Sequence, residues 1–62
     1  MPIVQVELLE GYTLAHKRLL VEKVTQAIVD SLGAPAEVVT IIIREMSKEN
    51  LSKAGILACD KI

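Results

Sequence analysis

The chain has 62 residues, a formal net charge of -1 and an apolar content of 52%. A chain of this length buries only about 60% of the surface that its unfolded form exposes, so a stable fold usually needs a disulfide, a metal or a partner subunit. One cysteine excludes an intrachain disulfide, and one histidine excludes a histidine-based zinc site. The composition therefore predicts one domain, residues 1–62, that is stable only as an obligate oligomer.

The charge balance and the scarcity of aromatic residues exclude several classes of partner. Seven basic and eight acidic residues leave no basic face for nucleic acid, and Tyr12 alone cannot form a stacking platform for bases. No apolar run approaches the roughly 18 residues of a membrane span, and the N-terminus lacks the pattern of a signal peptide. With a single unpaired cysteine, these features favour a cytoplasmic protein that binds neither nucleic acid nor membrane.

The first expected element is a strand over residues 2–9. In its sequence, PIVQVELL, every second residue is apolar and the residues between are of mixed polarity. This alternation, together with β-branched side chains, is typical of strands. The wholly apolar parity should face the core and consists of Val4, Val6 and Leu8. The opposite parity begins with Ile3 and is mixed, so we expect it to meet solvent or a neighbouring subunit.

An amphipathic helix is expected after a break at Glu10-Gly11. Thr13 offers an N-cap hydroxyl, and apolar residues then recur at helical spacing. Gly33 lies where a left-handed C-cap is favoured. The helix should therefore cover residues 14–32.

The strongest β run in the chain covers residues 38–43 and continues to Met46. It is apolar on both parities, which favours a central strand covered on both faces. A polar, loop-like stretch over residues 47–54 follows. The tail after Gly55 is expected to form a short strand or hairpin.

Strand, helix and strand at this spacing predict a β-α-β unit with parallel strands and a right-handed crossover. The fold class is therefore α+β, with a parallel two-stranded sheet, one helix and a short C-terminal strand or hairpin. One helix can cover only one face of such a sheet, so the other face and both edges stay open. Copies of the chain are expected to complete the sheet by oligomerisation.

Pro2 carries the most distinctive chemistry in the sequence. A small penultimate residue permits removal of Met1, which would leave a free prolyl secondary amine. An α-amine has a pKa of about 8, and burial in an apolar site lowers that pKa. The amine would therefore be a general base near neutral pH. A proline after the initiator methionine is also common without any function. If Met1 stays, the Pro2 nitrogen is an amide and not a base.

Several short segments at fixed positions together resemble one family. They are Pro2-Ile3 opening the first strand, Leu9-Glu10-Gly11 closing it, Leu32-Gly33-Ala34-Pro35 after the helix, and Ile41-Ile42-Ile43 with Glu45-Met46 in the second strand. At this total length, the sequence resembles a short-chain 4-oxalocrotonate tautomerase, of the tautomerase superfamily, over essentially all 62 residues.

The resemblance implies a hexamer of β-α-β protomers, assembled as a trimer of dimers, and a reaction without metal or organic cofactor. It implies an isomerase in which the amine of Pro2 is the acid and base that moves a proton along a dienol. The family's typical substrates are small enols similar to 2-hydroxymuconate, from the degradation of aromatic compounds.

The sequence departs from the family's pattern where substrate is bound. Family members carry arginines at the positions of Tyr12 and Thr40, and an aromatic residue of the pocket wall at the position of Leu51. A guanidinium binds carboxylates through paired donors and a full charge, which Tyr and Thr cannot supply. The resemblance therefore makes Pro2 the candidate catalytic residue and assigns substrate binding to the other three positions, with no metal site.

Other side chains offer partial substitutes for the missing arginines. Tyr12 either donates a hydrogen bond to a substrate oxygen or packs at a subunit contact. His16 is either a general acid near the site or an exposed residue. Arg44 lies about 13 Å further along the second strand than the family's arginine position, which favours a surface or interface charge. The cations of the first helical turn, Lys17 and Arg18, are expected to contact solvent.

Three functional hypotheses stay open. The first is an enol–keto tautomerase that uses Pro2 on a 2-hydroxydienoate- or phenylenolpyruvate-like enol, the latter needing less positive charge. The second is an arginine-less subunit that joins a second tautomerase-like chain in a heterohexamer. The third is a catalytically silent homologue that kept the fold.

Overall fold

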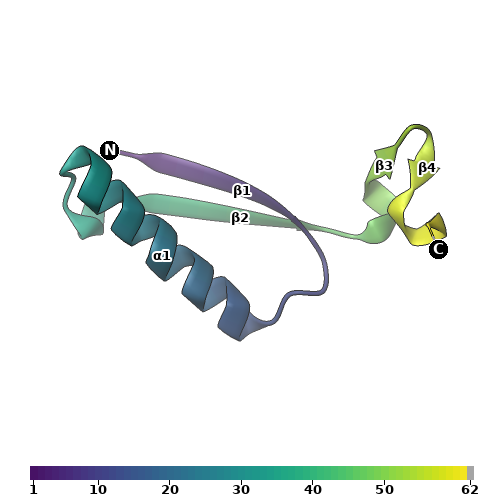
Figure 1. The fold of residues 1–62 in the computed structure, drawn as a ribbon, viewed down its shortest axis with the longest axis horizontal. Helices are drawn as coiled ribbons and strands as arrows, with labels where there is room; N and C mark the ends of the chain where they lie inside the picture. The colour runs from purple at the N-terminus through teal and green to yellow at the C-terminus, as the bar shows by residue number, and fades with distance from the viewer. Residues whose placement is uncertain (62) are drawn as a thin grey trace.

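The computed structural model describes residues 1–61. Two parallel strands form one sheet, a single long helix lies along it, and a small hairpin stands apart at the C-terminal end (Figure 1). The strands β1 (Ile3–Leu9) and β2 (Thr40–Met46) pair in register over all seven residues of each. The predicted α+β protomer, built on a β-α-β unit, is confirmed.

The helix α1 (Leu14–Leu32) has the bounds that the sequence predicted. The Thr13 hydroxyl accepts the N–H of His16 at 3.2 Å, and His16 Nδ1 accepts the N–H of Thr13 at 3.3 Å. This reciprocal capping box satisfies two donors at the start of the helix. Gly33 ends the helix with a φ of 71°, and its N–H donates to the Val29 carbonyl at 3.0 Å.

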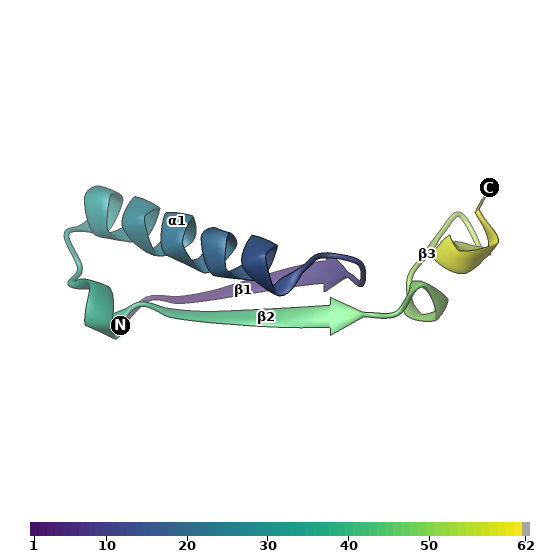
Figure 2. The same ribbon diagram turned by 90° about the horizontal axis from the view of Figure 1, so that it is seen from below.

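The helix covers one face of the sheet and leaves the other face open (Figure 2). Lys17 of α1 bonds to Glu45, whose register partner on β1 is Leu8, so the parity of Leu8 lies on the helix side. All three apolar side chains of that parity on β1 are half-buried, as predicted, whereas Ile3 on the opposite parity is 60% exposed. Among residues 1–61 no apolar side chain is fully buried, so the core of the protomer is incomplete.

The strand β2 begins two residues later than the sequence predicted. A 3-10 turn over Ala36–Val38 comes first, in which the N–H of Val38 donates to the Pro35 carbonyl at 3.2 Å. The N–H of Val39 donates to the Ala36 carbonyl at 3.1 Å. Because these two amides donate within the 3-10 turn, they do not join the hydrogen-bond ladder of the sheet. Val38 and Val39 therefore lie outside the strand.

The prediction of a central strand covered on both faces is wrong for the isolated protomer. Within residues 1–61, β2 pairs with β1 alone, and both strands are therefore edges of the sheet. Ile42, on the face away from the helix, is 37% exposed. The strand carries apolar side chains on both faces, and contacts within one chain do not account for those on the open face.

The short strand expected after Gly55 is present as β4 (Ile56–Leu57), and it forms a hairpin with β3 (Ser52–Lys53), which lies in the stretch predicted to be a loop. Ala54 and Gly55 join the strands with φ values of 53° and 79°. Two positive φ values in a two-residue loop are the requirement of a type I′ turn, which matches the twist of the flanking strands. The stretch before the hairpin is more ordered than predicted, since it contains a 3-10 turn over Lys48–Asn50.

The protomer is extended. Its radius of gyration is 14.8 Å, whereas a compact chain of this length would have about 11 Å. Its accessible surface of 4860 Å² exceeds by about 900 Å² the value of about 3950 Å² that its mass predicts for a compact monomer. Large apolar side chains contribute to this surface along the whole chain, among them Ile3, Leu14, Leu32 and Ile56. The surplus supports the expectation that copies of the chain complete the sheet and its core.

Within residues 1–61, no helix combines the length and the apolar content that crossing a membrane would require.

Candidate functional site

Pro2 lies immediately before β1 and is half-buried. Its carbonyl oxygen accepts the N–H of Thr40 at 2.9 Å, which extends the hydrogen-bond ladder between the strands by one step. Met1, in front of it, is 86% exposed, so removal of Met1 would take away no packed side chain. The proline nitrogen is thus held at the end of a fixed strand.

Thr40 is half-buried at the start of β2, opposite Ile3. Register partners of parallel strands direct their side chains to the same face, and Ile3 is on the face away from α1. Thr40 therefore lies on the open face of the sheet, next to the start of the chain. The structure thus brings together two of the four predicted site residues, Pro2 and Thr40.

Tyr12 lies near the other end of the sheet, between β1 and the helix cap. The chain turns there through Gly11, whose φ of 120° is a conformation that side-chain-bearing residues rarely adopt. Tyr12 is 54% exposed, and its ring meets the His16 imidazole edge to face, with 6.0 Å between ring centroids and an interplanar angle of 83°. Because His16 also closes the capping box with Thr13, the tyrosine ring contacts an imidazole that the helix start holds in place.

His16 was expected to be either a general acid or an exposed residue. The structure shows an exposed side chain with a structural role in the helix cap. Sequence reasoning found the Thr13 hydroxyl but missed its reciprocal partner, although the spacing of three residues is the signal of a capping box.

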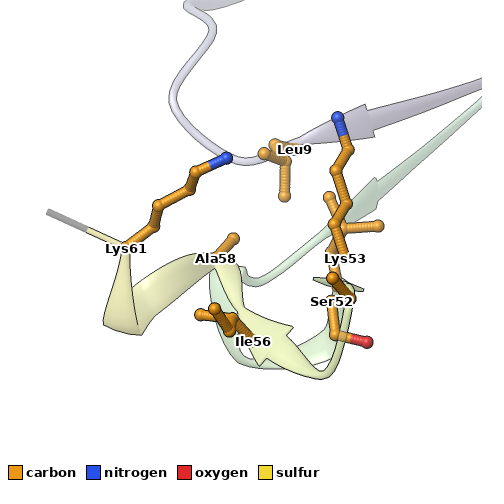
Figure 3. Close-up of a pocket in the computed structure, with 8 residues that line it drawn as sticks. Leu9, Ser52, Lys53, Ile56, Ala58 and Lys61 are labelled. Atoms are coloured by element: carbon orange, nitrogen blue, oxygen red, sulfur yellow. The ribbon is translucent and has the colours of Figure 1, made fainter.

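Leu51 is half-buried at the start of the C-terminal hairpin, and its carbonyl accepts the N–H of Ala58 at 2.8 Å. Together with Leu9, at the end of β1, it lines a mostly apolar cavity of about 330 Å³ (Figure 3). The other residues that line the cavity are Ser52, Lys53, Ala54, Ile56, Ala58 and Lys61.

One protomer does not bring all four predicted site residues together. Pro2 and Thr40 lie at the amino ends of the two strands, whereas Tyr12 and Leu51 follow their carboxyl ends. Seven residues of strand at about 3.3 Å each separate the two ends by roughly 20 Å. Figure 1 shows the same division, with the N-terminus and the C-terminal hairpin beyond opposite ends of the sheet.

The cations near the sheet are engaged with carboxylates of the same chain or lie beside them. Lys17, predicted to contact solvent, instead pairs with Glu45, with 2.7 Å between Nζ and Oε1. Arg44 is the register partner of Glu7 on the open face of the sheet. The ion pair of Lys17 and the position of Arg44 opposite Glu7 favour structural roles for both cations.

Two further cations line the cavity, and sequence reasoning missed both. In Figure 3 the side chains of Lys53 and Lys61 extend toward the Leu9 side of the cavity. No motif in the tail singles out these lysines. The available signal was their placement on either side of Gly55, which sequence reasoning took as the start of a strand or hairpin and not as its turn.

Among residues 1–61, no three His, Cys, Asp or Glu side chains gather as ligands of one metal ion would.

The chain is thus a small β-α-β protein with Pro2 before its first strand and a hairpin beyond the far end of the sheet. The chain matches the family model for tautomerase enzymes over residues 2–57. It is 45% identical over 58 residues to the 2-hydroxymuconate tautomerase of Pseudomonas putida, covering 94% of this chain and 92% of that protein. It is 47% identical over 55 residues to that of Bacillus subtilis, covering 89% of each.

Solved structures agree with the sequence relatives. YwhB, a homologue of 4-oxalocrotonate tautomerase, superposes with a TM-score of 0.93 at 43% identity, over 98% of this chain and all of its own. A 4-oxalocrotonate tautomerase isozyme of Methylibium petroleiphilum gives 0.89 at 41% identity, over 94% of this chain and 91% of that one. The chain therefore belongs to the tautomerase family, as the sequence resemblance indicated.

A heterohexameric 4-oxalocrotonate tautomerase from Chloroflexus aurantiacus also shares the fold. Its chain superposes with a TM-score of 0.90 over 97% of both chains, at 23% identity. At that identity the likeness concerns the fold alone.

Proposed function

We propose that this chain is an enol–keto tautomerase whose acid and base is the amine of Pro2, freed by removal of Met1. The observation that carries the proposal is the place of Pro2, half-buried and fixed by the hydrogen bond of its carbonyl to Thr40. Met1, directly before it, is exposed. The identity of 45% to a 2-hydroxymuconate tautomerase supports the same chemistry.

The reaction needs one group that removes a proton from oxygen and delivers a proton to carbon. A neutral prolyl amine at Pro2 would accept the proton of the enol hydroxyl, which becomes a carbonyl as the double bonds shift. The resulting ammonium would then return a proton to a carbon further along the conjugated chain. Atoms and charge balance over the cycle, and the amine is regenerated.

We infer that each complete site forms between chains. The two groups of predicted site residues lie at opposite ends of one sheet, so a second copy in the reverse orientation would bring the Leu51 end of one chain to Pro2 of another. Two-fold symmetric contacts produce such a reversal. The surplus apolar surface and the open sheet face supply the contact area. A hexamer built as a trimer of dimers would hold six such sites.

A second candidate function rests on the residues at two substrate-binding positions. Tyr12 and Thr40 stand where family members carry arginines, so this chain would suit one half of a mixed assembly in which a second tautomerase-like chain supplies the positive charge. Co-expression of the two chains from the native genome, followed by native mass spectrometry, tests this candidate. Homohexamers alone in the presence of the second chain would count against it.

Replacement of the proline tests the first proposal. We expect Pro2→Ala to lower kcat/KM for ketonisation of an enol by at least about 100-fold, because the secondary amine acts in both proton transfers. The assay uses 2-hydroxymuconate and phenylenolpyruvate, with protein that intact mass shows to lack Met1.

Protein that retains Met1 is the matched control, since its Pro2 nitrogen is an amide. It should be at least as inactive as the Pro2→Ala variant, whose N-terminal alanine still carries a primary amine. Equal rates for the variant and the processed wild type with both substrates would overturn the proposal and favour a catalytically silent homologue.

A further inference from the structure

We propose that Lys53 and Lys61 bind a carboxylate of the substrate and thereby supply the positive charge that Tyr12 and Thr40 lack. This assignment rests on the proposed function, because it places the lysines in the site where the Pro2 amine of another chain would act. The ligand class is an enol or dienol carboxylate with an apolar, conjugated body.

The cavity at the C-terminal hairpin has the composition that such a ligand needs. Its wall is mostly apolar, with Leu9 and Leu51 from two separate parts of the chain, and its volume is about 330 Å³. Small-molecule sites of this kind combine an apolar lining with a few charged groups that orient the ligand. The two lysines are the only charged residues among those that line this cavity.

Both lysines lie in backbone segments that are held by strand pairing or by a hydrogen bond. Lys53 is paired with Ile56 across the hairpin, next to the tight turn. Lys61 follows the 3-10 turn over Ala58–Asp60, and its N–H donates to the Ala58 carbonyl at 3.3 Å. In the view of Figure 3 the two ammonium groups extend on either side of Leu9. Two positive charges thus lie on either side of the apolar side chain of Leu9.

The other five cations of the chain are less suited to this task. Lys17 is paired with Glu45, and Arg44 is the register partner of Glu7. The remaining three do not line the cavity; they are Arg18, Lys23 and Lys48. Within residues 1–61, neither lysine of the cavity forms a salt bridge.

Neutral replacements with an unbranched side chain of similar length test the assignment. We expect Lys53→Met and Lys61→Met each to raise KM for 2-hydroxymuconate about tenfold, the loss of one charge-assisted contact, with kcat within about twofold. Lys53→Arg and Lys61→Arg keep the charge and should stay near wild type. Lys48→Met, in the neighbouring turn and outside the cavity, is the matched control and should leave KM unchanged.

A binding measurement separates failure of this assignment from failure of the proposed function. Calorimetric titration with muconate, the same six-carbon dicarboxylate without the enol hydroxyl, needs no turnover. We expect the double Met variant to lose at least about tenfold in affinity for muconate, and the loss to shrink at high ionic strength.

Unchanged KM and unchanged muconate affinity in the double Met variant would overturn the assignment and leave the Pro2 reaction intact. Lysine-dependent muconate binding without any turnover would sustain the assignment and refute the reaction. Native mass and circular dichroism of each variant check assembly and fold. If the Met variants do not assemble, Lys53→Gln and Lys61→Gln replace them in the same titration, with the same outcomes decisive.

Discussion

At the level of single residues, Tyr12 is the position at which the sequence resemblance implies a substrate-binding arginine, and it differs from arginine in two ways. Its hydroxyl offers one hydrogen bond and no charge, and its ring lies edge-on against the His16 imidazole. A tyrosine in this setting would favour substrates with one carboxylate over those with two.

Restoring the arginine tests this interpretation. We expect Tyr12→Arg to raise kcat/KM for the dicarboxylate 2-hydroxymuconate by about tenfold and to change the value for the monocarboxylate phenylenolpyruvate much less, because a guanidinium binds a carboxylate through paired, charged donors. Tyr12→Phe is the control, since it keeps the ring contact and loses only the hydroxyl. The same substrate preference in Tyr12→Arg and wild type would contradict a substrate-facing position for this residue.

At the level of elements, local signals predicted best. The helix bounds were correct because both ends depend on residues next to them, a Thr13 hydroxyl at one end and a left-handed Gly33 at the other. The start of β2 was wrong because a 3-10 turn after Pro35 competes for the same amides, and β propensity carries no information about that competition. The strand after Gly55 was predicted but its pairing with Ser52–Lys53 was not, since Ala54 has a positive φ that its residue type does not suggest.

The candidate site was less accessible to sequence reasoning than the fold. The contact between Pro2 and Thr40 depends on the parallel register, and the cavity joins Leu9 to a hairpin more than forty residues later in the chain. Lys53 and Lys61 become candidates only once that hairpin has folded back. Long-range placement of this kind leaves no periodic pattern in the sequence.

The helix cap yields a prediction at the same scale. We expect His16→Ala to lower the free energy of unfolding by about 1 kcal/mol per chain, the usual cost of a lost cap. His16→Gln should stay close to wild type, because glutamine at this position also closes a capping box with Thr13. Urea denaturation at one fixed protein concentration checks both, since stability and assembly are coupled. Equal losses in the two variants would show that the contact with Tyr12, rather than the cap, stabilises the helix start.

At the level of the whole molecule, one chain neither completes a core nor brings its four predicted site residues together. No apolar side chain among residues 1–61 is fully buried, and the radius of gyration of 14.8 Å is that of an extended chain. The same extension separates Pro2 from Leu51 by the length of the sheet. Folding and catalysis would therefore require the same contacts between copies, and a change that dissociates the assembly should remove both.

Mixed assemblies test most directly whether the site is shared between chains. One chain carries Pro2→Ala, and the other carries Leu51→Glu, whose carboxylate would repel the substrate. Each variant alone should be inactive. The two are co-refolded in equal amounts, native mass spectrometry confirms that hybrids form, and 2-hydroxymuconate turnover is measured.

If Pro2 of one chain acts beside Leu51 of another, about one quarter of the sites in a random mixture contain both intact residues. We therefore predict that the hybrids recover about one quarter of the wild-type rate. Hybrids no more active than the two separate variants would contradict a site formed between chains.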